Sequence, residues 1–130
     1  IMAGEGNDYG DGGASDDLIE GGLGLDQLMG SEGDDTLIGG AGDDTLVGGD
    51  GADVFHFGLG DNSDVIEDFT IGVDKISIDH QALGVTIGDE VQLQSMLTDT
   101  DWGTVLEFES GDRIGLVGVS KDDLSWSDFE

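Results

Sequence analysis

The sequence predicts an all-β fold: a right-handed parallel solenoid of two sheets, capped by a C-terminal β-hairpin region with one short helix. Three observations support this prediction. Glycines recur with a nine-residue period between Ala3 and His56, and an aspartate and an apolar residue recur with them. The 130-residue chain holds 25 glycines and no proline, far from globular averages. Its length fits one domain with a modest core.

The repeat consists of six tandem units, each a turn that ends on an aspartate. Glycine at the first, second and fourth positions permits backbone angles and close approaches that side chains forbid. We therefore expect each unit to form a turn followed by a three-residue strand. The sixth-position aspartates are Asp8, Asp17, Asp26, Asp35, Asp44 and Asp53, and the eighth positions are Gly10, Ile19, Leu28, Leu37, Leu46 and Phe55.

Two aspartate columns follow from the period. If nine residues make half a coil, units 18 residues apart become neighbours whose strands stack in parallel about 4.8 Å apart. One edge then carries the column that starts at Asp8, and the other carries the column that starts at Asp17. The chain has 31 acidic residues against 3 basic ones, and the first basic residue is Lys75. A solvated acidic tail is the alternative for an unpatterned charge run, but the strict period favours bound cations.

The chemistry of the turns favours calcium. Carboxylate and carbonyl oxygens suit hard cations, which disfavours zinc and copper. An ion midway between two coils would lie about 2.4 Å from oxygens on each, within the range for calcium and beyond that for magnesium. Calcium is therefore the predicted cofactor.

These units match the GGxGxDxUx nonapeptide, and the chain resembles the RTX, or haemolysin-type calcium-binding, proteins. The resemblance implies a calcium-bound parallel β-roll. It also implies that one turn supplies its aspartate with the carbonyls of its second and fourth residues. The turn two units later supplies its own aspartate with the carbonyls of its first and third residues. The four implied ligand sets are Gly4, Gly6 and Asp8 with Gly21, Leu23 and Asp26; Gly13, Ser15 and Asp17 with Gly30, Glu32 and Asp35; Gly22, Gly24 and Asp26 with Gly39, Ala41 and Asp44; and Ser31, Gly33 and Asp35 with Gly48, Asp50 and Asp53.

The pattern has two departures and one extension. Ser15 and Ser31 replace glycines, so we expect weaker sites where their carbonyls are used. A stretched seventh turn brings Asp64 to the aspartate position two residues late, where it could close a fifth site against Asp44. About four to five calcium ions are therefore expected. Asp68 and Asp74 are further candidate ligands.

Residues 1–56 are assigned to the nonapeptide-repeat roll and residues 57–130 to a capping region of the same domain. Residues 64–79 resemble the segment that follows the roll in serralysin-type proteases and alginate epimerase R-modules. The acidic ending, residues 122–130, resembles the tails of type I secretion substrates. The chain starts in mid-motif, which suggests a piece of a larger protein.

Within the cap, we expect a short helix over 89–97 with Asp89 as its N-cap. Residues 104–108 and 113–117 are predicted to form a hairpin. Trp102 and Trp126 are expected in the core rather than as sugar-stacking rings. His56 and His80 are expected at the surface.

The predicted function is a calcium-binding module that folds on calcium and supports the secretion and folding of a larger extracellular bacterial protein. Its expected partners are calcium, an N-terminal catalytic or adhesive domain and the type I secretion machinery. The alternative is an accessory polysaccharide-binding domain like an epimerase R-module.

Other classes are disfavoured. Three basic residues supply no patch for nucleic acid. There is no cysteine for a disulfide and no apolar run of about 18 residues for a membrane span. The chain has no HExxH or GxSxG motif, so catalysis within it is not expected.

Overall fold

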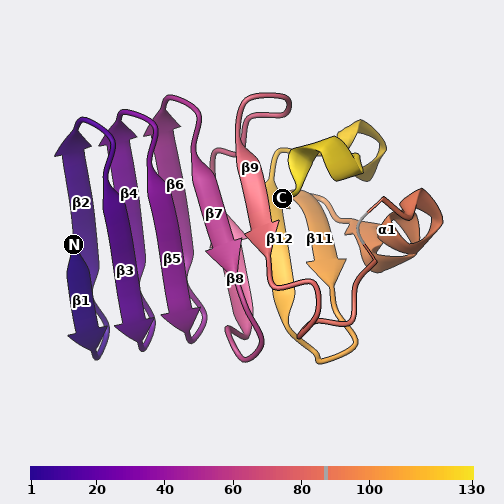
Figure 1. Cartoon of the computed structure of the whole chain (residues 1–130), viewed down its shortest axis with the longest axis horizontal. Coiled ribbons are helices and arrows are strands. Elements are labelled where there is room, and N and C mark those ends of the chain that lie inside the picture. Colours follow the sequence, from indigo (N-terminus) through magenta and orange to yellow (C-terminus); the bar gives the residue numbers. More distant parts are fainter. Residues whose placement is uncertain (87) are drawn as a thin grey trace.

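The computed structural model describes residues 1–86 and 88–130, which form an elongated two-sheet solenoid with a cap at its C-terminal end (Figure 1). The chain alternates between the two sheets as it winds. The five-stranded sheet has the order β1 (Met2–Glu5), β3 (Leu18–Leu23), β5 (Thr36–Ala41), β7 (Val54–Phe57) and β9 (Lys75–Ile78). The seven-stranded sheet has the order β10 (Leu97–Asp99), β11 (Gly103–Glu107), β12 (Arg113–Val117), β8 (Ser63–Ile66), β6 (Thr45–Asp50), β4 (Gln27–Glu32) and β2 (Tyr9–Ala14).

The register confirms that units 18 residues apart are neighbours. Met2 pairs with Glu20 and Tyr9 with Gln27, in parallel, and the same offset continues through β5 and β6. The sequence separation between paired residues increases where the regular repeat ends, because Thr45 pairs with Val65. The insertion is therefore absorbed in a turn and the strands stay in register.

The strands are longer than the three residues that we expected. Each regular strand from β2 to β6 has six residues, because pairing resumes at the second and third positions of the following turn. In β2 and β4, for example, Gly13 pairs with Ser31 and Ala14 with Glu32. Stacked turns of the same shape continue the ladder, since each coil repeats the backbone path of its neighbour.

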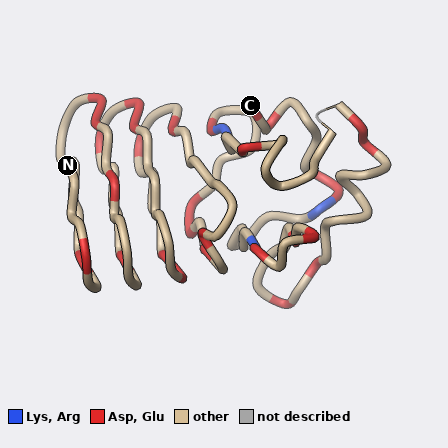
Figure 2. The backbone as a smooth tube through the Cα atoms, turned by 60° about the horizontal axis from the view of Figure 1, so that its bottom comes forward, with Lys and Arg blue, Asp and Glu red and all other residues tan. Residues whose placement is uncertain are grey.

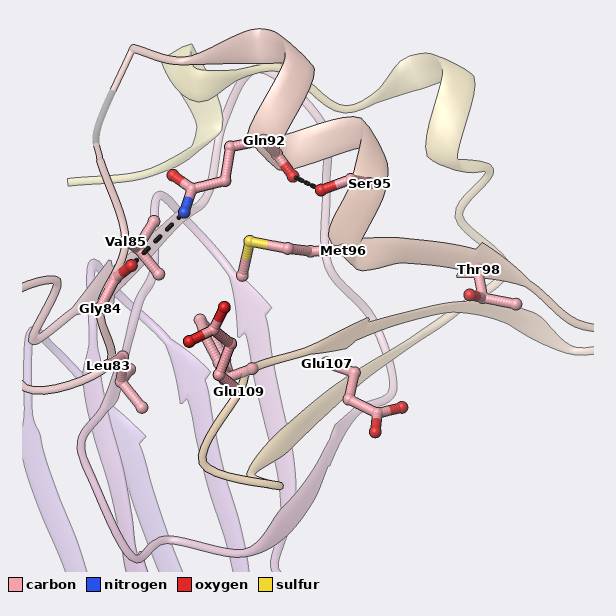
Figure 3. A pocket seen from close by; sticks show the side chains of 10 residues that line it. Leu83, Gly84, Val85, Gln92, Ser95, Met96, Thr98, Glu107 and Glu109 are labelled. Carbon is pink, nitrogen blue, oxygen red and sulfur yellow. Dashed lines mark hydrogen bonds between the residues drawn. The ribbon is translucent and has the colours of Figure 1, made fainter.

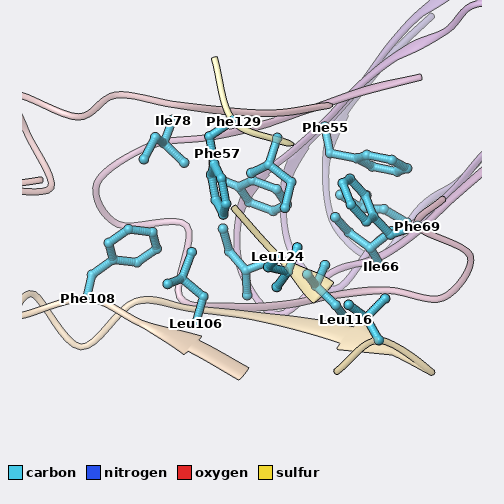
Figure 4. Close-up of a cluster of buried hydrophobic side chains, with 14 of the residues drawn as sticks. Phe55, Phe57, Ile66, Phe69, Ile78, Leu106, Phe108, Leu116, Leu124 and Phe129 are labelled. Atoms are coloured by element: carbon cyan, nitrogen blue, oxygen red, sulfur yellow. The ribbon is translucent and has the colours of Figure 1, made fainter. Parts of the chain in front are cut away.

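The eighth-position side chains fill the space between the sheets. Ile19, Leu37 and Phe55 from one sheet have no exposed surface, and neither has Leu46 from the other. The exception, Gly10, has a packing reason, because a Cβ there would lie 3.1 Å from the Ile19 side chain and 3.2 Å from that of Leu28. The same buried cluster continues from the roll into the cap, and it includes Phe55, Phe57, Ile66, Phe69, Ile78, Leu106, Phe108, Leu116, Leu124 and Phe129 (Figure 4).

The cap is joined to the roll by strand pairing. Helix α1 (Glu90–Met96) begins as predicted, with the Asp89 side chain accepting a hydrogen bond from the Gln92 amide at 3.0 Å. The predicted hairpin is confirmed as β11 and β12, and β12 pairs in parallel with β8. β10, which the sequence did not predict, adds an antiparallel edge beside β11. Two 3-10 turns, Lys121–Asp123 and Trp126–Asp128, end the chain.

The two tryptophans differ in environment. Trp126 is buried against Phe129, with ring centroids 5.1 Å apart, as predicted. The core assignment of Trp102 is wrong, because its side chain is 46% exposed. Its ring covers Gly115, where an added Cβ would lie 2.7 Å from the indole, so the missing side chain of Gly115 gives it room on the outer face of β12. Among the described residues, no helix has the length and apolar character needed to cross a membrane.

Candidate metal sites on two aspartate columns

The repeat aspartates form two hydrogen-bonded ladders, one along each edge of the roll. In each step, Oδ1 of one aspartate accepts the amide of the aspartate one coil earlier. The first column runs through Asp8, Asp26, Asp44 and Asp64, and the second through Asp17, Asp35, Asp53 and Asp74, with nitrogen-to-oxygen distances of 2.8 to 3.0 Å. Figure 2 shows acidic residues recurring at the turns of successive coils.

The second oxygen of these carboxylates has no protein partner. Oδ2 is buried and accepts no hydrogen bond in six of the column residues: Asp8, Asp26, Asp35, Asp44, Asp53 and Asp64. Five of the six, all but Asp8, are at most 2% exposed. A buried polar atom without a partner costs free energy, and a buried carboxylate needs a counter-charge. A row of such oxygens fits a cation.

Predicted ligands of one set converge beside the first-position glycines. A Cβ on Gly21 would lie 2.4 Å from Asp26 Oδ2 and 2.6 Å from the carbonyl oxygen of Gly39. A Cβ on Gly30 would lie 2.3 Å from Asp35 Oδ2 and 2.5 Å from the carbonyl oxygen of Gly48. In each case the oxygens come from two successive coils. Carboxylate and carbonyl oxygens that meet in this way are the donor set that calcium takes.

The two serines that interrupt the glycine pattern keep its backbone shape. Ser15 and Ser31 have φ of 92° and 84°, in the left-handed region that glycine adopts freely. For a residue with a side chain this conformation costs about 1–3 kcal/mol. Weaker binding at the sites that use these two carbonyls remains a prediction.

Burial raises the pKa of several column aspartates. The pKa of Asp64 rises to about 8, first because of burial and then because of neighbouring carboxylates such as Asp44 and Asp61. Burial, reinforced by nearby aspartates, raises the pKa of Asp44 and of Asp53 to about 6. The calcium-free columns therefore hold their charges unfavourably, and a divalent ion would restore the ionised state.

The fifth-position side chains form a second set of ladders, which sequence reasoning missed. Asp16 accepts the amide of Asp34, Asp34 that of Ala52 and Asp43 that of Ser63, at 2.8 to 3.1 Å. Asn7 accepts the Leu25 amide in the same way. An Asn or Asp at four of the six fifth positions was the available signal.

The two extra candidates, Asp68 and Asp74, accept backbone amides with both carboxylate oxygens. Asp68 accepts the amides of Gly48 and Gly49 at 2.9 and 2.8 Å. Asp74 accepts those of Asp53 and Thr70 at 3.0 and 2.8 Å. Both thus close the last coil by hydrogen bonding.

Side chains alone do not complete a metal site in the described part of the chain, where no three His, Cys, Asp or Glu residues are grouped to hold one. Each predicted set has only two carboxylates and depends on main-chain carbonyls. His56, half-buried, lies 3.2 Å from the Ser77 hydroxyl through Nδ1, and His80 is exposed. The histidines are therefore not brought together.

A pocket of about 370 Å³ lies between α1 and the hairpin, apart from both columns (Figure 3). Leu83, Met96 and Phe108 line it with Glu107 and Glu109. It contains none of the predicted site residues.

Comparisons with known proteins agree with the geometry. The family model described as the RTX calcium-binding nonapeptide repeat (4 copies) matches residues 2–37 and 29–64. A comparison with curated proteins found no match. The solved structure of the AlgE6R3 subunit of a mannuronan C5-epimerase from Azotobacter vinelandii is 31% identical, with a TM-score of 0.79, and the match covers 100% of this chain and 80% of that one. The AlgE6R2 subunit is 32% identical, with a TM-score of 0.73 and coverage of 99% and 90%. The extracellular lipase LipA from Serratia marcescens is 27% identical, with a TM-score of 0.69, and the match covers 91% of this chain but 20% of the lipase.

Proposed function

Because the chain belongs to the family of RTX calcium-binding repeat proteins, we propose that calcium bound along both aspartate columns folds its roll and so supports the folding and secretion of a larger extracellular bacterial protein. The repeats, residues 1–56, bind the ions together with Asp64, and residues 57–130 cap the roll. The observation that carries the proposal is the set of buried Oδ2 atoms without partners.

Five aspartate pairs would hold the ions. Four are the regular pairs Asp8/Asp26, Asp17/Asp35, Asp26/Asp44 and Asp35/Asp53, and the fifth is Asp44/Asp64. When bound, calcium supplies two positive charges at each pair. Five ions would offset about ten of the 28 net negative charges. Because the ions join successive coils, their binding free energy becomes folding free energy.

This coupling gives the module a switch. Without calcium, stacked aspartates repel one another, and one buried apolar residue in each unit does not offset the entropy of ordering nine. Extracellular calcium modules bind at about 10⁻⁴ to 10⁻³ M. The chain would therefore stay unfolded at the low calcium of a cytosol and fold outside the cell. The extracellular lipase among its structural neighbours supports this location.

Circular dichroism tests the proposal directly. The far-ultraviolet spectrum is recorded in chelator and during titration with calcium, with magnesium as the control cation. We expect a cooperative gain of β-structure in millimolar calcium and little response to magnesium. Equal β-structure in chelator and in calcium would refute coupled folding.

Polysaccharide binding is the second candidate, and its support is the 31% identity to an epimerase subunit over the whole chain. The charge of −28 disfavours an anionic sugar unless calcium bridges the two. Gel electrophoresis of the calcium-loaded protein through alginate, compared with a neutral polysaccharide, tests this candidate. Unretarded migration in both gels would remove it.

A further inference from the structure

The seventh turn is built differently from the six before it. Two additional residues precede Asp61, yet the turn returns to the regular pattern from Asp61 onward. The Gly42 amide donates to the Asp61 carbonyl at 3.3 Å, just as Gly24 donates to Ala41. Asn62 then takes the left-handed fourth position with φ of 70°, and Asp64 follows as the column aspartate. Asp64 thus reaches its column position although Asn62, rather than glycine, occupies the fourth position of this turn.

The regular turns are held from the side of the next coil. In the first five units, the fourth-position amide donates to a third-position carbonyl of the following coil, as in Ser15 to Glu32 at 2.8 Å and Gly33 to Asp50 at 2.9 Å. The seventh turn has a hairpin strand at this place, because β12 pairs with β8. Its fourth-position amide therefore needs another acceptor.

Asp112, the residue before β12, supplies that acceptor. Its Oδ1 accepts the Asn62 amide at 3.0 Å, and its Oδ2 accepts the Gly60 amide at 3.3 Å. The next amide along the hairpin, that of Arg113, donates to the Asn62 carbonyl at 2.7 Å. Asp112 is 8% exposed, so these bonds are shielded from water. One carboxylate thus holds both ends of the segment that immediately precedes Ser63 and Asp64.

The consequence concerns the fifth aspartate pair. Asp64 is 2% exposed, its Oδ1 accepts the Asp44 amide at 2.9 Å, and its Oδ2 has no partner. The direction of Asp64 Oδ2 depends on the backbone path of the seventh turn. The Asp112 carboxylate holds that backbone at Gly60 and Asn62. We propose that Asp112 is the positioning residue of the calcium site between Asp44 and Asp64, acting through the seventh turn without touching the ion. This assignment rests on the proposed function, because it requires calcium at that pair.

The test counts calcium ions per folded chain by equilibrium dialysis, with circular dichroism as the check on folding. D112N is isosteric but loses the negative charge and the acceptor capacity of one oxygen. We expect the Asp44/Asp64 ion to bind about 10- to 100-fold more weakly, as for other residues that orient a metal ligand, while the other sites keep their affinity. D112E, which keeps the charge but moves the oxygens, should weaken the same ion.

S110A is the matched control. The Ser110 hydroxyl donates to Asp112 from within the hairpin, so its removal disturbs the hairpin turn and leaves both amide bonds in place. S110A should therefore bind the full number of ions. D64N, which removes the ligand itself, defines the count without this site.

The outcomes separate the two proposals. If D112N and D112E bind as many ions as the unchanged protein, with equal affinity, Asp112 only braces the hairpin and the assignment is overturned, whatever the change in thermal stability. If D64N also leaves the count unchanged, the Asp44/Asp64 pair binds no calcium and the assignment falls with it. Absence of calcium binding from the unchanged protein would instead refute the proposed function.

Discussion

The amide of Asp44 donates a hydrogen bond to Oδ1 of Asp64, at 2.9 Å and 20 residues further along the chain. The five other steps of the two columns have the same geometry, although their separations are 18 residues in the regular coils and 21 between Asp53 and Asp74. Asp26, Asp35, Asp44, Asp53 and Asp64 thus each use one oxygen to join two coils and leave the other for a cation. A single residue type serves both the ladder and the proposed sites.

Substitution of an aspartate that belongs to two proposed calcium pairs should remove more ions than substitution of one that belongs to a single pair. Asp26 belongs to two pairs, with Asp8 and with Asp44, whereas Asp53 belongs to one regular pair, with Asp35. D26N should cost about two ions and D53N about one, because asparagine keeps the Oδ1 acceptor but loses the charge. Equilibrium dialysis measures both counts. Equal losses in the two variants would contradict the shared use of Asp26.

The first-position glycines should tolerate no side chain. In G21A the new Cβ would lie 2.4 Å from Asp26 Oδ2 and 2.6 Å from the Gly39 carbonyl oxygen. We expect loss of the ion between Asp26 and Asp44 and a fall of about 1–3 kcal/mol in the unfolding free energy of the calcium-loaded protein. Urea denaturation measures the fall. G58A is the control, because its Cβ meets nothing closer than 3.7 Å, and an equal fall there would contradict the steric explanation.

The fifth-position ladder should stabilise the roll through hydrogen bonds rather than charge. D34A removes the acceptor of the Ala52 amide, which lies 2.8 Å from Oδ1. We expect a loss of about 0.5–1.5 kcal/mol in unfolding free energy in saturating calcium. The ion count should not change. D34N, which keeps the acceptor without the charge, should remain close to the unchanged protein in urea denaturation, and an equal loss in D34N would favour an electrostatic role.

Acidification should favour the calcium-free fold and oppose calcium binding. Folding raises the pKa of Asp64 to about 8 and those of Asp44 and Asp53 to about 6, so the folded apo-protein binds more protons than the unfolded chain. The stability that these three groups contribute is greatest below the unfolded pKa of about 4 and is lost as the pH rises to about 8. In chelator, β-structure should therefore increase from pH 8 to pH 5.

The same carboxylates must lose their protons to bind calcium, so the calcium midpoint should rise as the pH falls through this range. Circular dichroism titrations at several pH values measure both trends. A calcium midpoint independent of pH between 5 and 8 would contradict the link between these carboxylates and the ion.

The sequence alone determined the parts of this protein that repeat. The nine-residue period predicted the parallel pairing, the two aspartate columns and the buried eighth positions, because every coil meets its neighbours at one fixed separation. The Asp89 cap and the hairpin were also predictable, since a capping residue and a turn act over a few residues. The ligand sets remain predictions, although the structure brings Asp26 Oδ2 near the Gly39 carbonyl oxygen and Asp35 Oδ2 near that of Gly48.

Only the tertiary structure decided the features that depend on contacts outside the period. The pairing of β12 with β8 and the bonds from Gly60 and Asn62 to Asp112 join segments about 50 residues apart, and no spacing in the sequence encodes that separation. The exposed position of Trp102 depends on the absent side chain of Gly115, which lies on β12, 13 residues further along the chain. In a repeat, the period fixes which residues of successive coils are in contact. The contacts of the cap instead depend on how its elements pack against the last coil.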